Sequence, residues 1–205
     1  MKYLLFFLFS FLFKTVIAQS SFDSTNFSFL CNNKYGINFE ISGKYYKTDH
    51  HRAFIPTYKT YSCLPYFFSE ALINKYHKGH YIIYFEFNDV ASSSEEGFKN
   101  LNKTLPNFDK NKNYLCLSGK KEREEGLMNI FTKSDFNKFN ADTILCIKVD
   151  SLAIVKNDPN FNNFIYVVAH KDNVGDIYVC FAFKKDYEDE IIEEIKNIWK
   201  IIKYQ

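Results

Sequence analysis

Residues 177–202, IYVCFAFKKDYEDEIIEEIKNIWKII, contain the change of pattern that decides the fold. The stretch opens with an apolar run, which is typical of a strand. After Asp186, isoleucines recur at helical spacing and form one apolar stripe: Ile191, Ile195, Ile198 and Ile202. We therefore predict a last strand followed by a C-terminal amphipathic helix that packs on the sheet. The alternative is a helix on a membrane surface, but the polar face of this helix starts acidic rather than basic.

The segments before this stretch predict further strands that come in adjacent pairs. Residues 164–170 and 176–184 form a hairpin through the polar residues 171–175. HYIIYFEFN (80–88) is apolar on both faces, which favours a central position in the sheet. The other predicted strands are a hairpin over 35–47 that turns at Ser42 and Gly43, and single strands over 113–118 and 143–150.

Helices are expected between these strands. They cover 65–78, beginning at Pro65 and stopped by Gly79, then 92–105, and a short turn over 134–139. Paired strands with separate helices favour the α+β class, here a central antiparallel sheet covered by helices. We predict a single domain over 19–205, in which 19–33 is a loose lead-in, 120–126 a charged loop and 157–163 a turn.

The N-terminal residues 1–18 have the layout of a cleaved signal peptide. Lys2 precedes an apolar run over 3–13, and the run is followed by small residues before Gln19. A membrane anchor is the alternative, but Lys14 interrupts the run well before the ~20 apolar residues that a spanning helix needs. We therefore expect a secreted or periplasmic protein with no membrane span after cleavage.

Removal of the leader changes the charge of the chain. Lys2 and Lys14 leave with it, which brings the 26 basic side chains level with the 24 acidic ones. A neutral domain has no basic surface field to attract nucleic acid. The expected partner is therefore an unidentified protein or small molecule, and no nucleic acid.

Five cysteines follow the leader, and export permits disulfides. Cys116, Cys146 and Cys180 lie in apolar runs, where a buried small hydrophobe is the expected role. Cys31 and Cys63 lie in less regular sequence and are the best candidates for a bridge.

A group of histidines near one carboxylate is the sharpest candidate for a metal site. Asp49, His50 and His51 are consecutive, and His77 and His80 stand three apart across a glycine. Imidazole and carboxylate groups are ligands that Zn²⁺ accepts. The alternative is that these are surface histidines on loops, because Gly79 would break a helix between the last two.

The catalytic residue types form no recognised active-site motif. Cys146, His170 and Asp172 could in principle supply a nucleophile, a base and an orienting acid. No nucleophile-elbow or phosphate-cradling glycine motif accompanies them. We therefore assign no catalytic residue and predict no cofactor.

Three stretches carry a resemblance to a known superfamily: YGINFEISGKYY (35–46), SDFNKFNADTILCIKVD (134–150) and the C-terminal stretch quoted above. On these, the chain resembles the PsbP-like superfamily, which includes the Mog-like Ran-binding proteins and small bacterial envelope proteins. The chain departs from the pattern in lacking a proline after the first strand and a lipid-anchor cysteine. The resemblance implies an antiparallel sheet covered by helices and a role as a binding or assembly factor, and it carries over no catalytic residue.

Two functional hypotheses follow. The first is an exported, non-catalytic binding or assembly module, which the neutral charge and the lack of a catalytic motif favour. The second is a small extracellular hydrolase, with a metal held through His50, His51, His77 and His80. The second requires that at least three of these side chains approach one point.

Overall fold

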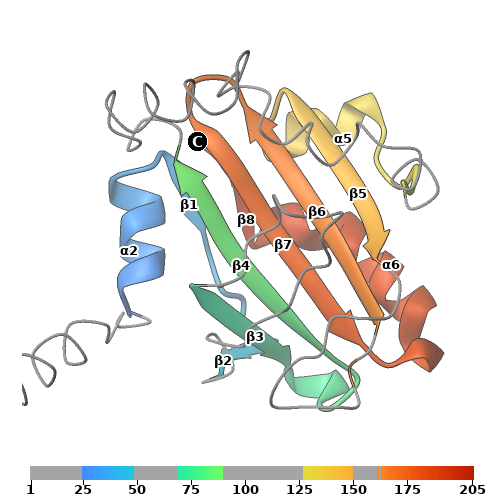
Figure 1. The fold of residues 1–205 in the computed structure, drawn as a ribbon. Coiled ribbons are helices and arrows are strands. Elements are labelled where there is room, and N and C mark those ends of the chain that lie inside the picture. Colours follow the sequence, from blue (N-terminus) through green and yellow to red (C-terminus); the bar gives the residue numbers. More distant parts are fainter. Residues whose placement is uncertain (1–24, 49–68, 90–126, 150–160, 162) are drawn as a thin grey trace, which may run out of the picture.

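A six-stranded antiparallel sheet forms the centre of the protein, with strand order β2-β3-β4-β7-β6-β5 (Figure 1). The structure is a computed structural model, and it describes residues 25–48, 69–89, 127–149, 161 and 163–205. The strands are β2 (Tyr45–Lys47), β3 (Glu70–Asn74), β4 (Tyr81–Asp89), β5 (Thr143–Val149), β6 (Asn163–Lys171) and β7 (Gly175–Phe183). The predicted α+β class and antiparallel sheet are confirmed.

The middle of the sheet follows the predicted pattern closely. β4 lies between β3 and β7, as its two apolar faces predicted. β6 and β7 form the predicted hairpin, and all nine residues of β7 are buried. A strand with two apolar faces is shielded from water on both sides only in the centre of the sheet, where both faces are covered.

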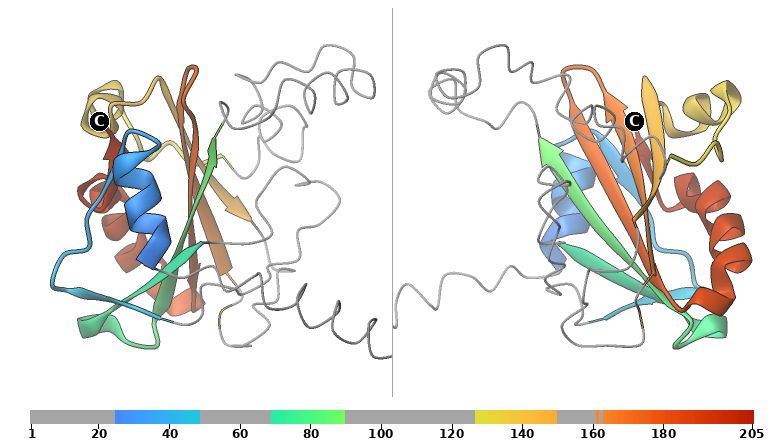
Figure 2. Two further views of the ribbon diagram at one scale, coloured as in Figure 1. Left: turned by 90° about the vertical axis from the view of Figure 1, so that its left-hand side faces the viewer. Right: turned by 45° about the vertical axis from the view of Figure 1, so that its right-hand side comes forward.

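Three helices lie on one side of this sheet: α2 (Thr25–Asn33), α5 (Lys133–Phe139) and α6 (Glu188–Asn197) (Figure 2). Each contributes side chains to the main core cluster, among them Phe27 and Cys31 from α2 and Phe139 from α5. Ile191 and Ile195 of α6 are fully buried there, so the predicted packing of the C-terminal helix on the sheet is confirmed. A second buried cluster on the opposite face holds Tyr84, Tyr166, Tyr178 and their neighbours.

The predicted hairpin over 35–47 is wrong. β1 (Ile37–Phe39) pairs with the C-terminal strand β8 (Ile202–Tyr204) in a separate two-stranded sheet, whereas β2 pairs with β3. The amide of Glu40 extends the first pairing by donating to the carbonyl of Ile201 at 2.8 Å. The chain therefore passes from one sheet to the other at the expected turn, because a strand from the far end of the sequence takes the place beside β1.

The predicted C-terminal helix ends earlier than its apolar stripe. α6 ends at Asn197, the 3₁₀ turn η7 (Ile198–Lys200) follows, and Ile202 lies in β8. Ile202 is nevertheless fully buried in the main core cluster. The isoleucine stripe therefore predicted which residues are buried, but not where the helix ends. The backbone amides and carbonyls of β8 pair with those of β1. A further helical turn over the same residues would forgo this pairing.

Two other predictions are corrected. Of the predicted helix over 65–78, the structure describes residues 69–78, which form strand β3 and the 3₁₀ turn η4 (Lys75–His77). Antiparallel pairing with β2 and β4 outweighs the local helix signals there. The predicted loose lead-in over 19–33 contains α2, which Phe27 and Cys31 anchor to the core at helical spacing.

Several expected segments lie outside the described residues. They are the leader over 1–18, the helix over 92–105, the strand over 113–118, the charged loop over 120–126 and nearly all of the turn over 157–163. Among the residues that the structure does describe, no helix is both long and apolar enough to cross a membrane.

Candidate functional site

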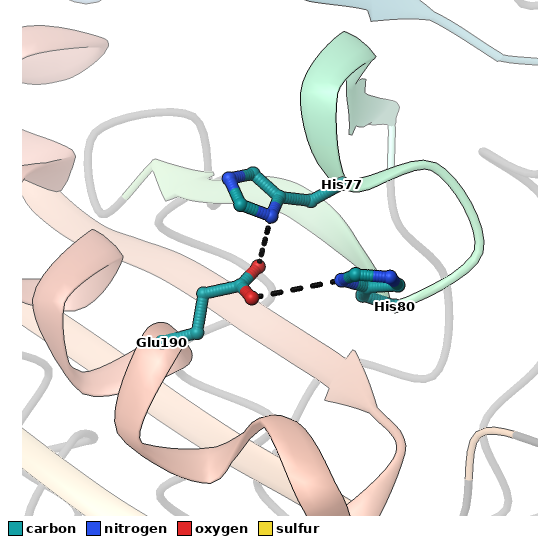
Figure 3. Close-up of side chains that lie close together, drawn as sticks. All are labelled: His77, His80 and Glu190. Atoms are coloured by element: carbon teal, nitrogen blue, oxygen red, sulfur yellow. Dashed lines mark ion pairs between the residues drawn. The ribbon is translucent and has the colours of Figure 1, made fainter.

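Three side chains that can bind a metal meet at one end of the sheet. His77 and His80 come from the connection between β3 and β4, and Glu190 comes from the first turn of α6 (Figure 3). Their candidate ligand atoms all lie within 4.8 Å of one another. Nδ1 of His77 lies 2.8 Å from Oε1 of Glu190, and Nδ1 of His80 lies 3.6 Å from Oε2.

The β3–β4 connection positions the two histidines by local backbone structure. Asn74 caps η4 by accepting a hydrogen bond from the amide of Tyr76, and His77 ends this 3₁₀ turn. Gly79 then adopts a left-handed conformation with φ of +82°, which favours glycine. The amide of His80 donates to the carbonyl of His77 at 3.0 Å, so both imidazoles stay on the same tight turn.

The sheet brings Glu190 to this turn. Tyr81 at the start of β4 pairs with Phe183 at the end of β7, and the amide of Lys184 donates to the carbonyl of His80 at 3.1 Å. The chain then passes through η6 (Lys185–Tyr187) into α6, so the first turn of α6 begins beside the histidines. The strand register therefore sets the position of the carboxylate.

An aromatic ring holds one of the imidazoles in place. Tyr187, directly before α6, stacks on His80 with ring centroids 3.8 Å apart and an interplanar angle of 14°. The side chains of His77, His80 and Glu190 remain 36%, 31% and 26% exposed, respectively. The cluster therefore lies at the surface of the protein, with some of its ligand atoms covered.

A second polar network lies one helical turn further along α6. The Glu194 carboxylate accepts hydrogen bonds from Lys44 at 2.9 Å and Asn74 at 3.2 Å, and also from the hydroxyl of Tyr45. Burial by itself raises the pKa of Glu194, but the hydrogen bonds from Tyr45 and Lys44 outweigh it and lower that pKa. Because its oxygens are already engaged, Glu194 supports the turn and leaves Glu190 as the accessible carboxylate.

Of the predicted metal ligands, the structure brings together His77 and His80. Asp49, His50 and His51 lie outside the described residues, so the predicted larger set stays a prediction. Sequence reasoning missed Glu190, whose place in the acidic first turn of the helix was fully explained by the helix dipole. No signal in the sequence could have found it, because the register of β4 with β7 brings Glu190 to the histidines and no pattern in the sequence sets that register.

The cysteines of the described residues are buried. Burial raises the pKa of Cys31 and of Cys146 to about 12, and it also raises the pKa of Cys180. These thiols therefore stay protonated and are poor nucleophiles. Cys31 is a free buried thiol, and Cys63 lies outside the described residues, so a bridge between them stays a prediction.

Cys146 and His170 do not form a catalytic pair. Cys146 lies opposite Val167 in the β5–β6 ladder and shares the main core face with it. His170 follows Val167 by three residues, so its side chain points to the other face of the sheet.

His170 is instead held between two carboxylates in the β6–β7 hairpin. Its Nδ1 lies 2.7 Å from Oδ1 of Asp176, and its Nε2 lies 3.0 Å from Oδ1 of Asp172. Burial by itself lowers the pKa of His170, but the hydrogen bonds to the two aspartates outweigh it and raise that pKa. Both ring nitrogens are engaged, which indicates a structural role at the hairpin.

The substitution Asp172→Asn tests this arrangement by its pH dependence. A raised folded-state pKa stabilises the fold below the ordinary histidine pKa of about 6.5, and this stabilisation is lost as the pH rises through the folded-state value. We expect a cost of less than about 1 kcal/mol, because Asp172 is 64% exposed, and a larger cost in mildly acidic than in alkaline buffer. Urea unfolding at both pH values measures it. The exposed Asp186→Asn is the control, and an equal cost at both pH values would contradict the account.

These observations define the class of the chain: an α+β protein with a buried antiparallel sheet and a His₂Glu cluster at one sheet end. In the comparisons with known proteins, no family model, no curated protein and no solved structure matches it.

Proposed function

We propose that the chain is an exported, non-catalytic binding or assembly module whose partner is an unidentified protein or small molecule. The proposal includes cleavage of residues 1–18 and a secreted or periplasmic location. The resemblance to the PsbP-like superfamily supports the same role, because that superfamily consists mostly of binding and assembly factors.

The observation that carries this proposal is the structural use of the buried thiols, of His170 and of Glu194 among the described residues. The accessible exception is the cluster of His77, His80 and Glu190. Cys31, Cys146 and Cys180 are buried thiols with raised pKa values. His170 is clamped by two aspartates, and the Glu194 carboxylate is saturated by its own neighbours. These groups hold the fold together, so they are not available for attack on a substrate.

An exposed aromatic side chain offers a contact point for a partner. Tyr76 is 80% exposed and lies between Lys75 and His77 on the β3–β4 connection. Tyrosine is enriched at protein interfaces because its ring buries apolar area while its hydroxyl keeps a polar contact. This turn is therefore the place to search for a bound partner.

Crosslinking in the producing cell tests the proposal. A photoreactive residue at position 76 should give a discrete crosslinked product, whereas the same residue at position 193, on the exposed side of α6, should not. The purified protein should also fail to turn over a panel of ester, peptide and glycoside substrates. Turnover without a crosslinked partner would overturn the proposal.

A second candidate function is a small metal-dependent hydrolase, which the convergence of two imidazoles and one carboxylate favours. Such an enzyme needs a metal-bound water and a general base beside it. Its distinguishing result is turnover by the metal-loaded protein that is lost in His77→Ala. The metal-free protein should show no turnover either. The non-catalytic module predicts no turnover with or without added metal.

A further inference from the structure

We propose that His77, His80 and Glu190 bind a divalent transition-metal cation, with Zn²⁺ as the ion that fits the donor set best. This inference goes beyond the proposed function, because a binding module can carry such a site whether or not it performs chemistry. It takes two of its ligands from the predicted set and adds a carboxylate from the C-terminal helix.

The donor set matches the cation in type and in spacing. Two imidazole nitrogens and one carboxylate are ligands that Zn²⁺ binds at about 2.0–2.2 Å, which puts neighbouring ligand atoms about 3.3 Å apart in a tetrahedral site. The two distances from the carboxylate to the imidazoles, 2.8 and 3.6 Å, bracket this value. The two distances end on different carboxylate oxygens, and all the ligand atoms lie within 4.8 Å of one another, so the three donors surround a space of the size that one ion occupies.

Two buried polar atoms at the cluster point independently to a ligand. Within the described part of the chain, Nδ1 of His80 and Oε1 of Glu190 have no hydrogen-bond partner, although both are shielded from solvent. Oε1 instead lies in ion-pair contact with Nδ1 of His77 at 2.8 Å. A shielded polar atom without a hydrogen bond is costly, and a cation between these donors would contact both atoms.

The alternative explanation is a simple ion pair between Glu190 and one protonated histidine. A partly exposed ion pair contributes little, typically below about 1 kcal/mol. Such a pair also leaves the second imidazole, whose ring centroid lies 5.6 Å from the first, without a role. A cation bound between the three side chains uses all three donors.

The surrounding residues hold the ligands as an outer shell would. Tyr187 stacks on His80, and Tyr81 lies nearly parallel to His77 at an interplanar angle of 26°. Asn74 caps the turn that carries His77 and donates to both Tyr81 and Glu194. These contacts limit the motion of the two imidazoles and keep the turn that carries them in place.

Partial exposure leaves a position for a fourth ligand. Three protein ligands with a water in the remaining position are the arrangement of open zinc sites. The fourth ligand can also come from a partner or from elsewhere in the chain. The substitutions below separate these sources from the three ligands named here.

Calorimetric titration of the exported protein with Zn²⁺ tests the proposal. The protein is isolated without a polyhistidine tag and stripped with a chelator, and we expect one ion bound per chain, with Ca²⁺ and Mg²⁺ binding far more weakly because they prefer all-oxygen sites. His77→Ala, His80→Ala and Glu190→Gln should each weaken binding by about 10-fold to 100-fold or more. Co²⁺ provides a second measurement, since its visible absorption reports coordination directly.

Matched controls keep the result interpretable. Glu193→Gln changes an exposed carboxylate on the same helix and should bind Zn²⁺ as the unsubstituted protein does. Zn²⁺ should raise the unfolding temperature of the unsubstituted protein and of this control, but not of the three ligand variants. Circular dichroism shows that each variant is folded before it is titrated.

Three outcomes would overturn the site. The first is no binding by the unsubstituted protein at any soluble concentration. The second is undiminished binding in the folded ligand variants. The third is loss of binding in the His50→Ala, His51→Ala double variant while His77→Ala binds normally, because the ion would then be held elsewhere.

Discussion

Gly175→Ala should destabilise the protein by about 3 kcal/mol or more, because the new methyl group has no space and the backbone is strained. Gly175 begins β7 with φ of +148°, a conformation that residues with a side chain rarely adopt. A Cβ there would clash with the backbone carbonyl oxygen of Asn88 and lie 2.9 Å from the ring of Phe87. The free energy of unfolding from urea denaturation measures the effect.

Gly175 also has a second structural role. The carbonyl of Gly175 accepts a hydrogen bond from the hydroxyl of Tyr204 at 2.8 Å, which ties the C-terminal strand to the β6–β7 hairpin. Gly43→Ala is the matched control, since Gly43 has open space around its Cβ position and no positive φ. We expect the control to stay within about 0.5 kcal/mol. Equal stability of the two variants would contradict this account of Gly175.

Ile195→Ala should cost about 3 kcal/mol, within the range for removing several buried methyl and methylene groups from a core. Ile195 is fully buried between α6 and the sheet, so the substitution leaves a cavity that the surrounding strands cannot fill without moving. Urea unfolding measures the loss in the free energy of unfolding. A chelator is present in the measurement, so that no metal at Glu190 contributes to it.

A graded series checks that the cost follows burial. Ile195→Val should cost about 1 kcal/mol because only one methylene group is lost. Glu193→Ala, at a position that is 69% exposed on the same helix, should change stability by no more than about 0.5 kcal/mol. A cost for Ile195→Ala as small as that of Glu193→Ala would mean that α6 does not pack on the sheet as described.

The structural elements that were predicted correctly owe their form to neighbours in sequence. The β6–β7 hairpin joins two apolar runs through a short polar turn, and α5 begins at a local capping box formed by Thr132 and Asp135. α6 begins with acidic residues, which interact favourably with the dipole at a helix N-terminus. In each of these cases the interactions that decide the structure span only a few residues.

The errors arose where a distant segment supplied the partner. Residues 37–39 alternate as a hairpin strand should, but β8 from the C-terminus pairs with them. Residues 70–74 carry helix-compatible side chains, yet they join the sheet by pairing with β2 from an earlier part of the chain, and with the neighbouring β4. Backbone pairing between distant segments outweighs local propensity, because each buried amide and carbonyl must find a partner.

The candidate site divides in the same way. The His77–His80 spacing is visible in the sequence and marked both residues as candidate ligands, since a tight turn keeps them close wherever it lies. The third ligand depends on the register of β4 with β7 and on the entry of the chain into α6. The sequence by itself therefore determined the class of fold, the central strands and two of the three candidate ligands through local pattern. Only the tertiary structure decided which strand pairs with β1 and which carboxylate faces the histidines, because those contacts join segments that no local pattern connects.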